Sequence, residues 1–414
     1  MSKKIIVIGA GVIGLHCAYY LNEAGFEVEV IEAGSENNED GCSYGNCGLL
    51  VPSHFVPLAS PEMLRSGLKM MLDRTSPVYL PPGKNISSLP WFFKFIKAAN
   101  KKSVARAIPT LYKLNDESRK LYEELSAQNK NQSGFTNKGL LMAATTEKGL
   151  EEEVALAKIA KDLGIKTQLL DQQQLKTIEP EIDLQVAGAV LYKSDGNVSP
   201  EGHLRWLKSY LKAGGIVFRY DTSVNRFQVE KGKIKAVDTS FGKLNADEFV
   251  LATGSYSAKL VASVGVKVPV ISGKGYSFDL QKDRLKLQTP LILTEAKVAL
   301  TPFENTVRLG SGMEFNGTIG DISYNRVQAI INRTQKALPN MEKLDAKKLD
   351  IWEGLRPVTP TGVPIIGRTN KYNNLLVAAG HAMMGVSLGP ITGKIISQLV
   401  VGEKPDFDMD LMSI

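Results

Sequence analysis

Three glycines and one acidic residue near the N-terminus are spaced for binding a dinucleotide. Gly9, Gly11 and Gly14 follow the apolar run IIVI and open a segment with helical character. Glycines at this spacing allow a tight turn, a close approach of the backbone to a pyrophosphate, and close packing of helix on strand. Glu32 ends the next apolar run, where its carboxylate can accept hydrogen bonds from both ribose hydroxyls. The pattern predicts a dinucleotide site, and a glycine turn followed by a solvated glutamate is the structural alternative.

A second loop of small residues, GCSYGNCG over residues 41–48, favours a flavin dinucleotide. Ser43 and Asn46 add side-chain donors to the backbone donors of this loop, which ends at Gly48. Such a loop suits a second wrap around a diphosphate and the near edge of a flavin, whereas an NAD enzyme has no evident need of it. A plain Gly/Ser/Asn loop is the alternative.

Two further glycine-containing segments have the same character. The apolar run FVLATGS, residues 249–255, ends in a small-residue turn that contains Thr253 and Gly254 and would let the backbone pass under a dinucleotide. Gly380 and Gly385 bracket the sequence GHAMMG before a final helical stretch. A helix that begins there points its positive end at what lies before it, which favours the flavin edge where negative charge develops on reduction.

The elements that would position these residues alternate along the chain. The patterns predict strands at 5–9, 28–31, 187–192, 249–255 and 375–380, helices at 11–24, 61–72, 147–163, 201–214 and 385–401, a helical pair over 89–129, a hairpin at 134–145, and an antiparallel sheet over 266–278 and 291–315. Because α/β segments at the start, middle and end flank two β-richer inserts, the simplest fold class is α/β with a discontinuous domain.

Composition excludes several classes of protein. The 414 residues carry 50 Lys and Arg against 43 Asp and Glu, a net charge of +7 that is scattered rather than clustered. With no helix-turn-helix, RNP or arginine-rich signature, nucleic acid is not expected as a partner. The three cysteines, Cys17, Cys42 and Cys47, form neither a disulfide framework nor a zinc pattern. We therefore expect no bound metal, and we expect the protein to lie in a reducing, cytoplasmic compartment.

Taken together, these motifs resemble the FAD-dependent D-amino acid oxidase superfamily, most closely its bacterial D-amino acid and (hydroxy)proline dehydrogenases. The similarity extends over essentially the whole chain, through IGAGVIG, SYGNCG, DGNVSP, VLATGS, PVISGKGYS, GLRPVTPTGVPIIG and LLVAAGHAMMG. It implies a discontinuous Rossmann-like FAD-binding domain and an α+β substrate domain with an antiparallel sheet. The expected segments are 1–75, 195–265 and 350–414 for the FAD-binding domain, and 76–194 and 266–349 for the substrate domain.

The resemblance also implies roles for individual residues. FAD is expected to bind non-covalently. The expected contacts with the ADP-ribose are Gly9, Gly11, Gly14 and Glu32, and Val224 would contact the adenine through its main chain. Ser43, Asn46 and Gly48 would make the inner contacts with FAD, Thr253 and Gly254 would pass under the dinucleotide, and Gly380, Gly385 and Val386 would lie at the flavin edge. The candidates at the reaction centre are Arg356, His381 and Tyr276. Arg356 would clasp the substrate carboxylate through two parallel hydrogen bonds. His381 could act as a base, but the hydride transfer implied by the resemblance needs orientation of the substrate more than it needs a base. Tyr276 and His54 would either line the pocket or pack in the structure.

The function implied is hydride transfer from Cα of a D-amino acid to flavin N5, giving an imino acid, with D-proline or cis-4-hydroxy-D-proline as possible substrates. Electrons would pass to a quinone or another carrier rather than to oxygen. An oxygen-using glycine or sarcosine oxidase, a non-catalytic FAD-binding protein and an NAD-dependent dehydrogenase are the alternatives.

The stretch LPWFFKFIK, residues 89–97, combines aromatic and basic residues and is followed by Lys101 and Lys102. Such a stretch can lie in a membrane interface. A peripheral position on the inner face of the cytoplasmic membrane is therefore one interpretation, and aromatic packing over the substrate domain is the other.

Overall fold

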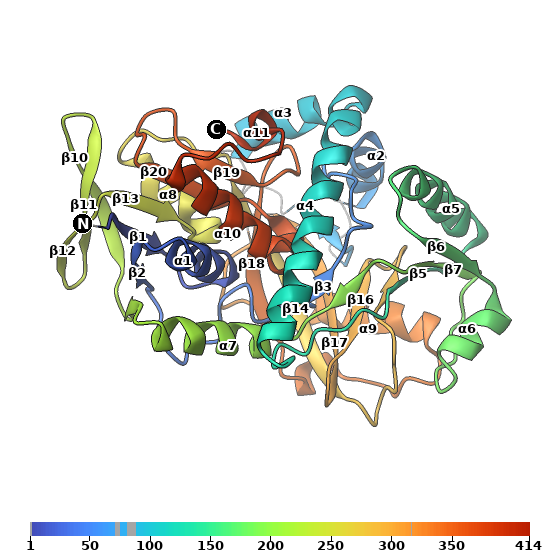
Figure 1. Ribbon diagram of the computed structural model, residues 1–414. Helices are drawn as coiled ribbons and strands as arrows, with labels where there is room; N and C mark the ends of the chain where they lie inside the picture. The colour runs from blue at the N-terminus through green and yellow to red at the C-terminus, as the bar shows by residue number, and fades with distance from the viewer. Residues whose placement is uncertain (1, 71–74, 81–87, 316) are drawn as a thin grey trace.

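The half of the molecule expected to hold the dinucleotide, here named the cofactor half, is built on a six-stranded sheet with the strand order β19-β20-β13-β1-β2-β9. A computed structural model describes residues 2–70, 75–80, 88–315 and 317–414 of the chain, and Figure 1 shows its arrangement. The six strands are β1 (Lys4–Ile8), β2 (Glu27–Ile31), β9 (Val217–Arg219), β13 (Glu248–Leu251), β19 (Ile365–Arg368) and β20 (Leu375–Ala379). All neighbours are parallel except β19 and β20. The predicted α/β class is confirmed, with strands drawn from the start, middle and end of the chain.

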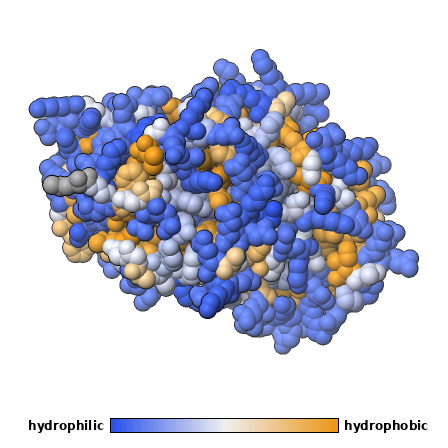
Figure 2. All heavy atoms as spheres, in the orientation of Figure 1, coloured by the Kyte–Doolittle hydropathy of each residue, from blue (hydrophilic) through white to orange (hydrophobic). Residues whose placement is uncertain are grey.

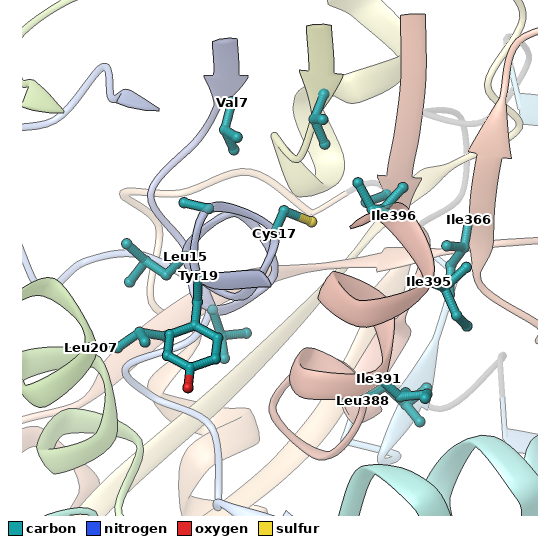
Figure 3. Close-up of a cluster of buried hydrophobic side chains, with 14 of the residues drawn as sticks. Val7, Leu15, Cys17, Tyr19, Leu207, Ile366, Leu388, Ile391, Ile395 and Ile396 are labelled. Carbon is teal, nitrogen blue, oxygen red and sulfur yellow. The ribbon is translucent and has the colours of Figure 1, made fainter. Parts of the chain in front are cut away.

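Both faces of this sheet are buried. Successive residues of a strand point to opposite faces, so neighbouring residues of β1 pack in different clusters. Ile5 and Val7 pack against helices, whereas Ile6 and Ile8 pack in a separate cluster on the other face. The helices on the first face are α1 (Val12–Glu23), α4 (Lys101–Gln128), α7 (Pro200–Ala213) and α10 (Gly385–Val401). Figure 3 shows the apolar side chains of α1 and α10 between these layers. The tail Ala382–Val401 is the one described helix apolar and long enough to cross a bilayer, but 67% of its window is buried here as core.

A small antiparallel sheet covers the opposite face. Its strands are β10 (Val224–Glu230), β11 (Lys233–Thr239) and β12 (Gly242–Asn245). Phe227 and Val237 of this sheet pack with Phe249 of β13, beside Val261 of α8 (Ser257–Ala262). The cofactor half is therefore a three-layer arrangement of helices, parallel sheet and antiparallel sheet, in which a small sheet covers the face that a second helical layer covers in a doubly wound fold.

The other half is built on a nine-stranded sheet of mostly antiparallel strands. Its order is β18-β14-β17-β16-β15-β5-β7-β6, with β4 beside β17. The strands are β4 (Val78–Tyr79), β5 (Leu140–Ala144), β6 (Thr167–Leu170), β7 (Gly188–Tyr192), β14 (Ile271–Gln281), β15 (Leu291–Leu293), β16 (Val298–Pro302), β17 (Thr306–Phe315) and β18 (Trp352–Val358). One face packs on α9 (Tyr324–Ala337) and part of α6 (Gln172–Ile178), and α5 (Glu147–Asp162) packs beside β7.

The remaining elements are short strands, helices and turns outside the three sheets described above. They are β3 (Leu49–Leu50) paired with β8 (Gly196–Asn197), helices α2 (Pro61–Met70), α3 (Leu89–Ala98) and α11 (Met409–Met412), and the short turns η2 (Gly254–Tyr256), η3 (Ala346–Lys348) and η4 (Ala382–Met384). The predicted helix over 61–72 is confirmed to Met70, and residues 71 and 72 lie outside the described residues. The predicted pair of helices over 89–129 is confirmed as α3 and α4.

The predicted hairpin at residues 134–145 is wrong. Only β5 forms there, and its neighbours are β7 and β15 rather than a strand from the same segment. Thr136 instead makes an isolated bridge with Asn197. Local alternation of residue type identified the strand, but its partners come from distant parts of the chain.

The division into five segments remains a prediction, and two elements pack in the half other than the one to which their segment is assigned. Strand β18, which follows the boundary at residue 350, lies in the nine-stranded sheet. Helix α4, assigned to the substrate segment 76–194, packs its Leu111, Leu114 and Tyr122 into the core of the cofactor half.

Candidate cofactor and substrate site

The turn between β1 and α1 is a tight one that only glycine can form. Gly9 has φ +105°, and a Cβ there would lie 2.6 Å from the Ala252 carbonyl oxygen. A Cβ on Gly14 would overlap the Gly9 carbonyl oxygen, so α1 is held directly against the strand end. At Gly11 the nearest neighbour of an added Cβ is Ser43 Oγ, at 3.4 Å. The packed glycines fix the helix, and Gly11 leaves its N-terminus approachable by an anion.

Glu32 follows β2 and faces this turn. Its carboxylate accepts hydrogen bonds from the backbone N–H of Ala10 (2.7 Å) and of Gly34 (2.9 Å). A carboxylate offers about four lone-pair positions, so two stay open for ribose hydroxyls. The segment before Val224 runs alongside, because the Thr222 N–H donates to the Glu32 carbonyl (2.9 Å). The two predicted ADP-ribose contacts from distant parts of the chain therefore lie near each other.

The loop of residues 41–48 joins α1 to the start of α10. Ser43 Oγ accepts a hydrogen bond from the Val12 N–H at 3.0 Å, in the first turn of α1. Asn46 Nδ2 donates to the Met383 carbonyl at 3.0 Å, and its Oδ1 accepts from the Gly48 N–H at 2.8 Å. The loop thus connects the two helix N-termini where a diphosphate and a flavin edge are expected.

The remaining predicted FAD residues border the same region. Gly254, at φ +54°, follows β13, and no described atom lies within 4 Å of a Cβ added there. Its neighbour Thr253 lies next to Gly9, since the Thr253 Cα is 3.5 Å from a Cβ placed on Gly9. Gly385 begins α10 and is similarly open, with His381 Cβ 3.8 Å from an added Cβ.

Val386, next in α10, is held by a hydrogen bond from the Tyr122 hydroxyl to its carbonyl at 2.7 Å. Gly380, at φ +81°, closes β20, and a Cβ there would collide with Thr359. Three glycines with open surroundings, Gly11, Gly254 and Gly385, therefore come from three separate elements. Each lies near a closely packed glycine, and together they border a region, here named the cradle, that larger side chains at these positions would fill. The residues present fit a bound dinucleotide.

Arg356 lies on the face of the nine-stranded sheet that is turned to this loop. It pairs with Gly273 of β14, and its guanidinium covers Gly275 so closely that a Cβ there would overlap it. Its Nη1 donates to the Gly312 carbonyl. Burial lowers the pKa of Arg356, with the Cys42 and Cys47 thiols acting in the opposite direction. A guanidinium still carries its charge at neutral pH.

The charge on Arg356 has no partner of opposite sign in the part of the chain that the structure describes. None of the ion pairs within the described ranges includes it, in contrast to Arg308 on β17, which lies beyond β14 in the same sheet. Arg308 makes a two-bonded pair with Asp279, at 2.8 and 2.9 Å, and a third bond to Glu201 at 2.9 Å. A partly buried guanidinium without a carboxylate partner is a binding position for a carboxylate from outside the chain.

Tyr276 does not belong to this face, which corrects the prediction that it acts in the pocket. Neighbouring residues of a strand alternate between faces, and Arg356, Gly275 and Ser277 occupy the side opposite to Tyr276. The Tyr276 ring is 1% exposed and packs in the core cluster with Phe278 on the α9 side. Burial raises the pKa of its hydroxyl to about 12.

His381 also differs from its predicted role as a base. The side chain is buried, and its Nε2 lies 3.0 Å from Thr392 Oγ1 in the second turn of α10. Burial lowers the pKa of His381 to about 3. A base is most effective with a pKa near the working pH, so His381 is poorly suited to proton abstraction and instead holds the start of α10.

His54 belongs to a partly buried polar chain that the sequence did not reveal. Its Nδ1 lies 3.1 Å from Ser53 Oγ, which donates to Asp195 at 2.5 Å. Burial lowers the pKa of His54 to about 4, with Lys297 adding to the effect, and burial raises the pKa of Asp195 to about 7. The chain fixes residues 51–54, since the Val51 N–H also donates to Ser387 Oγ of α10 at 3.2 Å.

Two more residues of the site were missed, Trp352 and Arg308. The Trp352 ring covers Gly354 and Gly45, where an added Cβ on either glycine would overlap it. Arg308 contacts the backbone of residues 44–46. The one signal available for Arg308 was a charged residue inside an otherwise apolar strand, TVRLGSG. For Trp352 there was none, because its neighbour Gly45 is distant in sequence.

Comparison with known proteins identifies the family. The model of the FAD dependent oxidoreductase (DAO) family matches residues 4–399. The chain belongs to this family. It is therefore an FAD-dependent oxidoreductase, and the NAD-dependent alternative is excluded.

Curated relatives and solved structures agree with this assignment. The chain is 30% identical over 413 residues to a D-amino acid dehydrogenase of Helicobacter pylori, covering 100% of this chain and 98% of the relative. A D-amino acid dehydrogenase of Bradyrhizobium diazoefficiens is 28% identical over 423 residues, covering 99% and 98%. Glycine oxidase from Geobacillus kaustophilus has the same fold, with a TM-score of 0.78 at 22% identity and coverage of 100% and 98%. L-proline dehydrogenase from P. horikoshii gives 0.74 at 20%, covering 100% and 96%.

Proposed function

We propose that this protein is a D-amino acid dehydrogenase. The observation that carries the proposal is Arg356, a partly buried cation that faces the cofactor loop and has no carboxylate partner among the described residues. A non-catalytic FAD-binding protein would have no use for such a group. The names of the full-length relatives support an amino acid as the ligand.

In the proposed reaction, the amino acid loses a hydride from Cα and a proton from its nitrogen and becomes an imino acid. Bound FAD supplies the hydride acceptor. Arg356 holds the carboxylate and so fixes which face of Cα is presented. Because His381 is neutral and bonded to Thr392, the amine proton is lost to water rather than to a histidine base.

The residues proposed to hold FAD are those of the cradle. Glu32 would bind the ribose. The N-terminus of α1 would bind the diphosphate, with Ser43 and Asn46 beside it, and the N-terminus of α10 would bind the flavin edge. Met383 and Met384 at that edge give an apolar boundary, which suits small apolar and cyclic substrates such as D-proline or cis-4-hydroxy-D-proline.

The assay for function is anaerobic bleaching of the flavin absorbance of the purified holoenzyme. The panel contains D- and L-amino acids, D-proline, cis-4-hydroxy-D-proline, glycine and sarcosine. Selective bleaching by D-amino acids is expected, and bleaching by glycine or sarcosine with peroxide formation in air would instead establish an oxidase. A flavin that no amino acid bleaches would contradict the proposal.

Replacement of Arg356 tests the carboxylate site. Arg356→Ala is expected to lower kcat/KM by about 30-fold to 5,000-fold, because loss of one partner of a buried charge pair costs roughly 2–5 kcal/mol. Arg356→Lys should recover only part of this, since an ammonium cannot form two parallel bonds to a carboxylate.

The matched control is Arg106→Ala, which removes an exposed guanidinium paired with Asp408 and should leave kcat/KM unchanged. Flavin absorbance establishes that each variant is loaded. An FAD-loaded Arg356→Ala enzyme with the kcat/KM of the parent would remove the carboxylate role.

We further propose that electrons leave to a quinone or similar carrier at the inner face of the cytoplasmic membrane. Helix α3 exposes Leu89 (48%), Phe93 (70%) and Ile96 (53%), spaced by four and three residues and therefore on one helix face. Lys94 and Lys97 on α3 and Lys101 and Lys102 at the start of α4 are also exposed. An apolar helix face bordered by lysines matches the interface of an anionic bilayer.

A further inference from the structure

The nine-stranded sheet is tied to the cofactor loop by a buried arginine whose donors are fully used. Arg308 of β17 is 6% exposed. Two of its bonds go to Asp279 and one to Glu201, and Nη1 donates to the carbonyl oxygens of Tyr44 and Asn46. Burial alone would lower the pKa of Arg308, but the bonds and charge of Asp279 raise it.

A second tie runs from the adjacent strand to the same loop. Ser277 of β14 is 2% exposed, and its hydroxyl donates to the Gly45 carbonyl at 2.9 Å. Ser277 is paired with Gly310 of β17, and the absence of a side chain on Gly310 leaves room for Cys47 Sγ. Three successive carbonyls, those of residues 44, 45 and 46, are therefore held by this one face of the sheet.

Holding these carbonyls sets the direction of the groups that face the cofactor. When the carbonyls of Tyr44, Gly45 and Asn46 point to the sheet, the other side of the loop is presented to the cradle. Asn46 then reaches Met383 at the flavin edge, and Ser43 reaches the first turn of α1. Neither Arg308 nor Ser277 needs to touch the cofactor to control its site.

We propose that Arg308 and Ser277 are positioning residues for FAD, through which the substrate-side sheet sets cofactor affinity. The inference rests on the proposed role of residues 43–48 in FAD binding. It assigns the Arg308–Asp279 pair, of which only the arginine is buried, a role beyond stability, because the same guanidinium also bonds two loop carbonyls.

The experiment measures the FAD dissociation constant from the fluorescence of FAD released on dilution of holoenzyme. Ser277→Ala removes one tie without burying a charge and is expected to raise the dissociation constant by about threefold to tenfold. Arg308→Lys keeps a cation beside Asp279 but loses the two-carbonyl contact, and an increase of at least about tenfold is expected. Thermal unfolding of the FAD-free forms is recorded in parallel.

Two controls separate positioning from structural stability. Ser311→Ala removes an equally buried serine of β17 whose hydroxyl donates to the Lys297 carbonyl at 2.7 Å, away from the loop. Glu201→Gln removes the negative charge of the partially exposed partner of Arg308 and leaves the bonds of Arg308 to the loop in place. Both are expected to leave the FAD dissociation constant within about twofold of the parent.

The outcomes are distinct. If Ser277→Ala and Arg308→Lys lower the melting temperature of the FAD-free protein but leave the FAD dissociation constant unchanged, the two residues are structural and the inference is wrong. If only Arg308→Lys fails to fold, Ser277→Ala against Ser311→Ala still decides. Asn46→Ala tests the loop itself. If this variant binds FAD with unchanged affinity, the loop's proposed role is wrong. If it binds FAD more weakly while Ser277→Ala and Arg308→Lys do not, only the inference about Arg308 and Ser277 is wrong.

Discussion

All four histidines of the chain lie in surroundings that disfavour a positive charge. Burial lowers the pKa of His203 and His381 to about 3 and that of His54 to about 4, and it lowers the pKa of His16 well below its usual value. His16 and His203 face each other, with their Nε2 atoms 2.9 Å apart, so the protonation of one is also opposed by the other. None is poised to titrate at neutral pH in the folded protein.

Acid should therefore unfold the protein through its histidines. Below about pH 6.5 the unfolded chain binds protons that the folded chain does not, so each histidine lowers the free energy of unfolding by up to about 1.4 kcal/mol per pH unit as the pH falls toward the folded pKa. Asp195, whose folded pKa is raised to about 7, acts in the opposite direction, because its stabilising effect is lost as the pH rises from about 4 to 7.

The measurement is urea unfolding between pH 4.5 and 7.5 at saturating FAD. The free energy of unfolding should fall steeply on the acid side, and His381→Asn, which keeps an amide able to bond Thr392, should make that fall shallower. A free energy of unfolding that does not change over this pH range would show that the histidines are not held neutral.

At the scale of elements, the contact between β1 and α1 is the most demanding in the cofactor half. Gly14→Ala would drive a methyl group into the Gly9 carbonyl and push α1 away from the sheet. Overpacking of this kind costs about 1–3 kcal/mol or more. We expect reduced FAD content and a lowered melting temperature. Gly367→Ala in β19, where no described atom lies within 4 Å, is the control that should show neither. Full FAD loading and an unchanged melting temperature in Gly14→Ala would contradict this account of the turn.

Elements defined by local pattern were predictable, and those defined by register were not. The glycine turn and Glu32 lie in one strand–helix–strand unit, so spacing alone placed them correctly relative to each other. Tyr276 was misplaced because a shift of one residue moves a side chain to the opposite face of a sheet. Arg308 and Ser277 depend on pairing between strands and a loop more than 200 residues away in sequence, and no spacing rule reports such a contact.

At the scale of the whole molecule, apolar surface is expected to be spread in small patches. Figure 2 shows one face on which hydrophilic residues dominate and apolar areas are scattered among them. Helix α3, at the top of Figure 1 beside α2, combines an apolar face with lysines. That combination, rather than exposure alone, distinguishes it from single exposed residues such as Phe241 (76%).

Binding to vesicles tests the membrane proposal. The holoenzyme should bind vesicles that contain phosphatidylglycerol more strongly than neutral ones, and binding should weaken with added salt because lysines contribute. Phe93→Glu should reduce the binding by about tenfold or more, since it places a charge in the apolar face. Phe241→Glu is the matched control. Equal binding by the two variants, or no binding by the parent, would contradict a membrane role for α3.

The order of strands in the cofactor sheet has a consequence for synthesis of the protein. Strand β1 lies between β2 and β13, β13 pairs with β20, and α10 covers the result, so the sheet combines residues 4–8 with residues 248–251 and 375–379. A ribosome must release almost the entire chain before the cradle can close. Until then, β1 and α1 lack the apolar neighbours that β13, β20 and α10 supply. Since a ligand stabilises only the folded state that binds it, capture of FAD selects chains that have been completed.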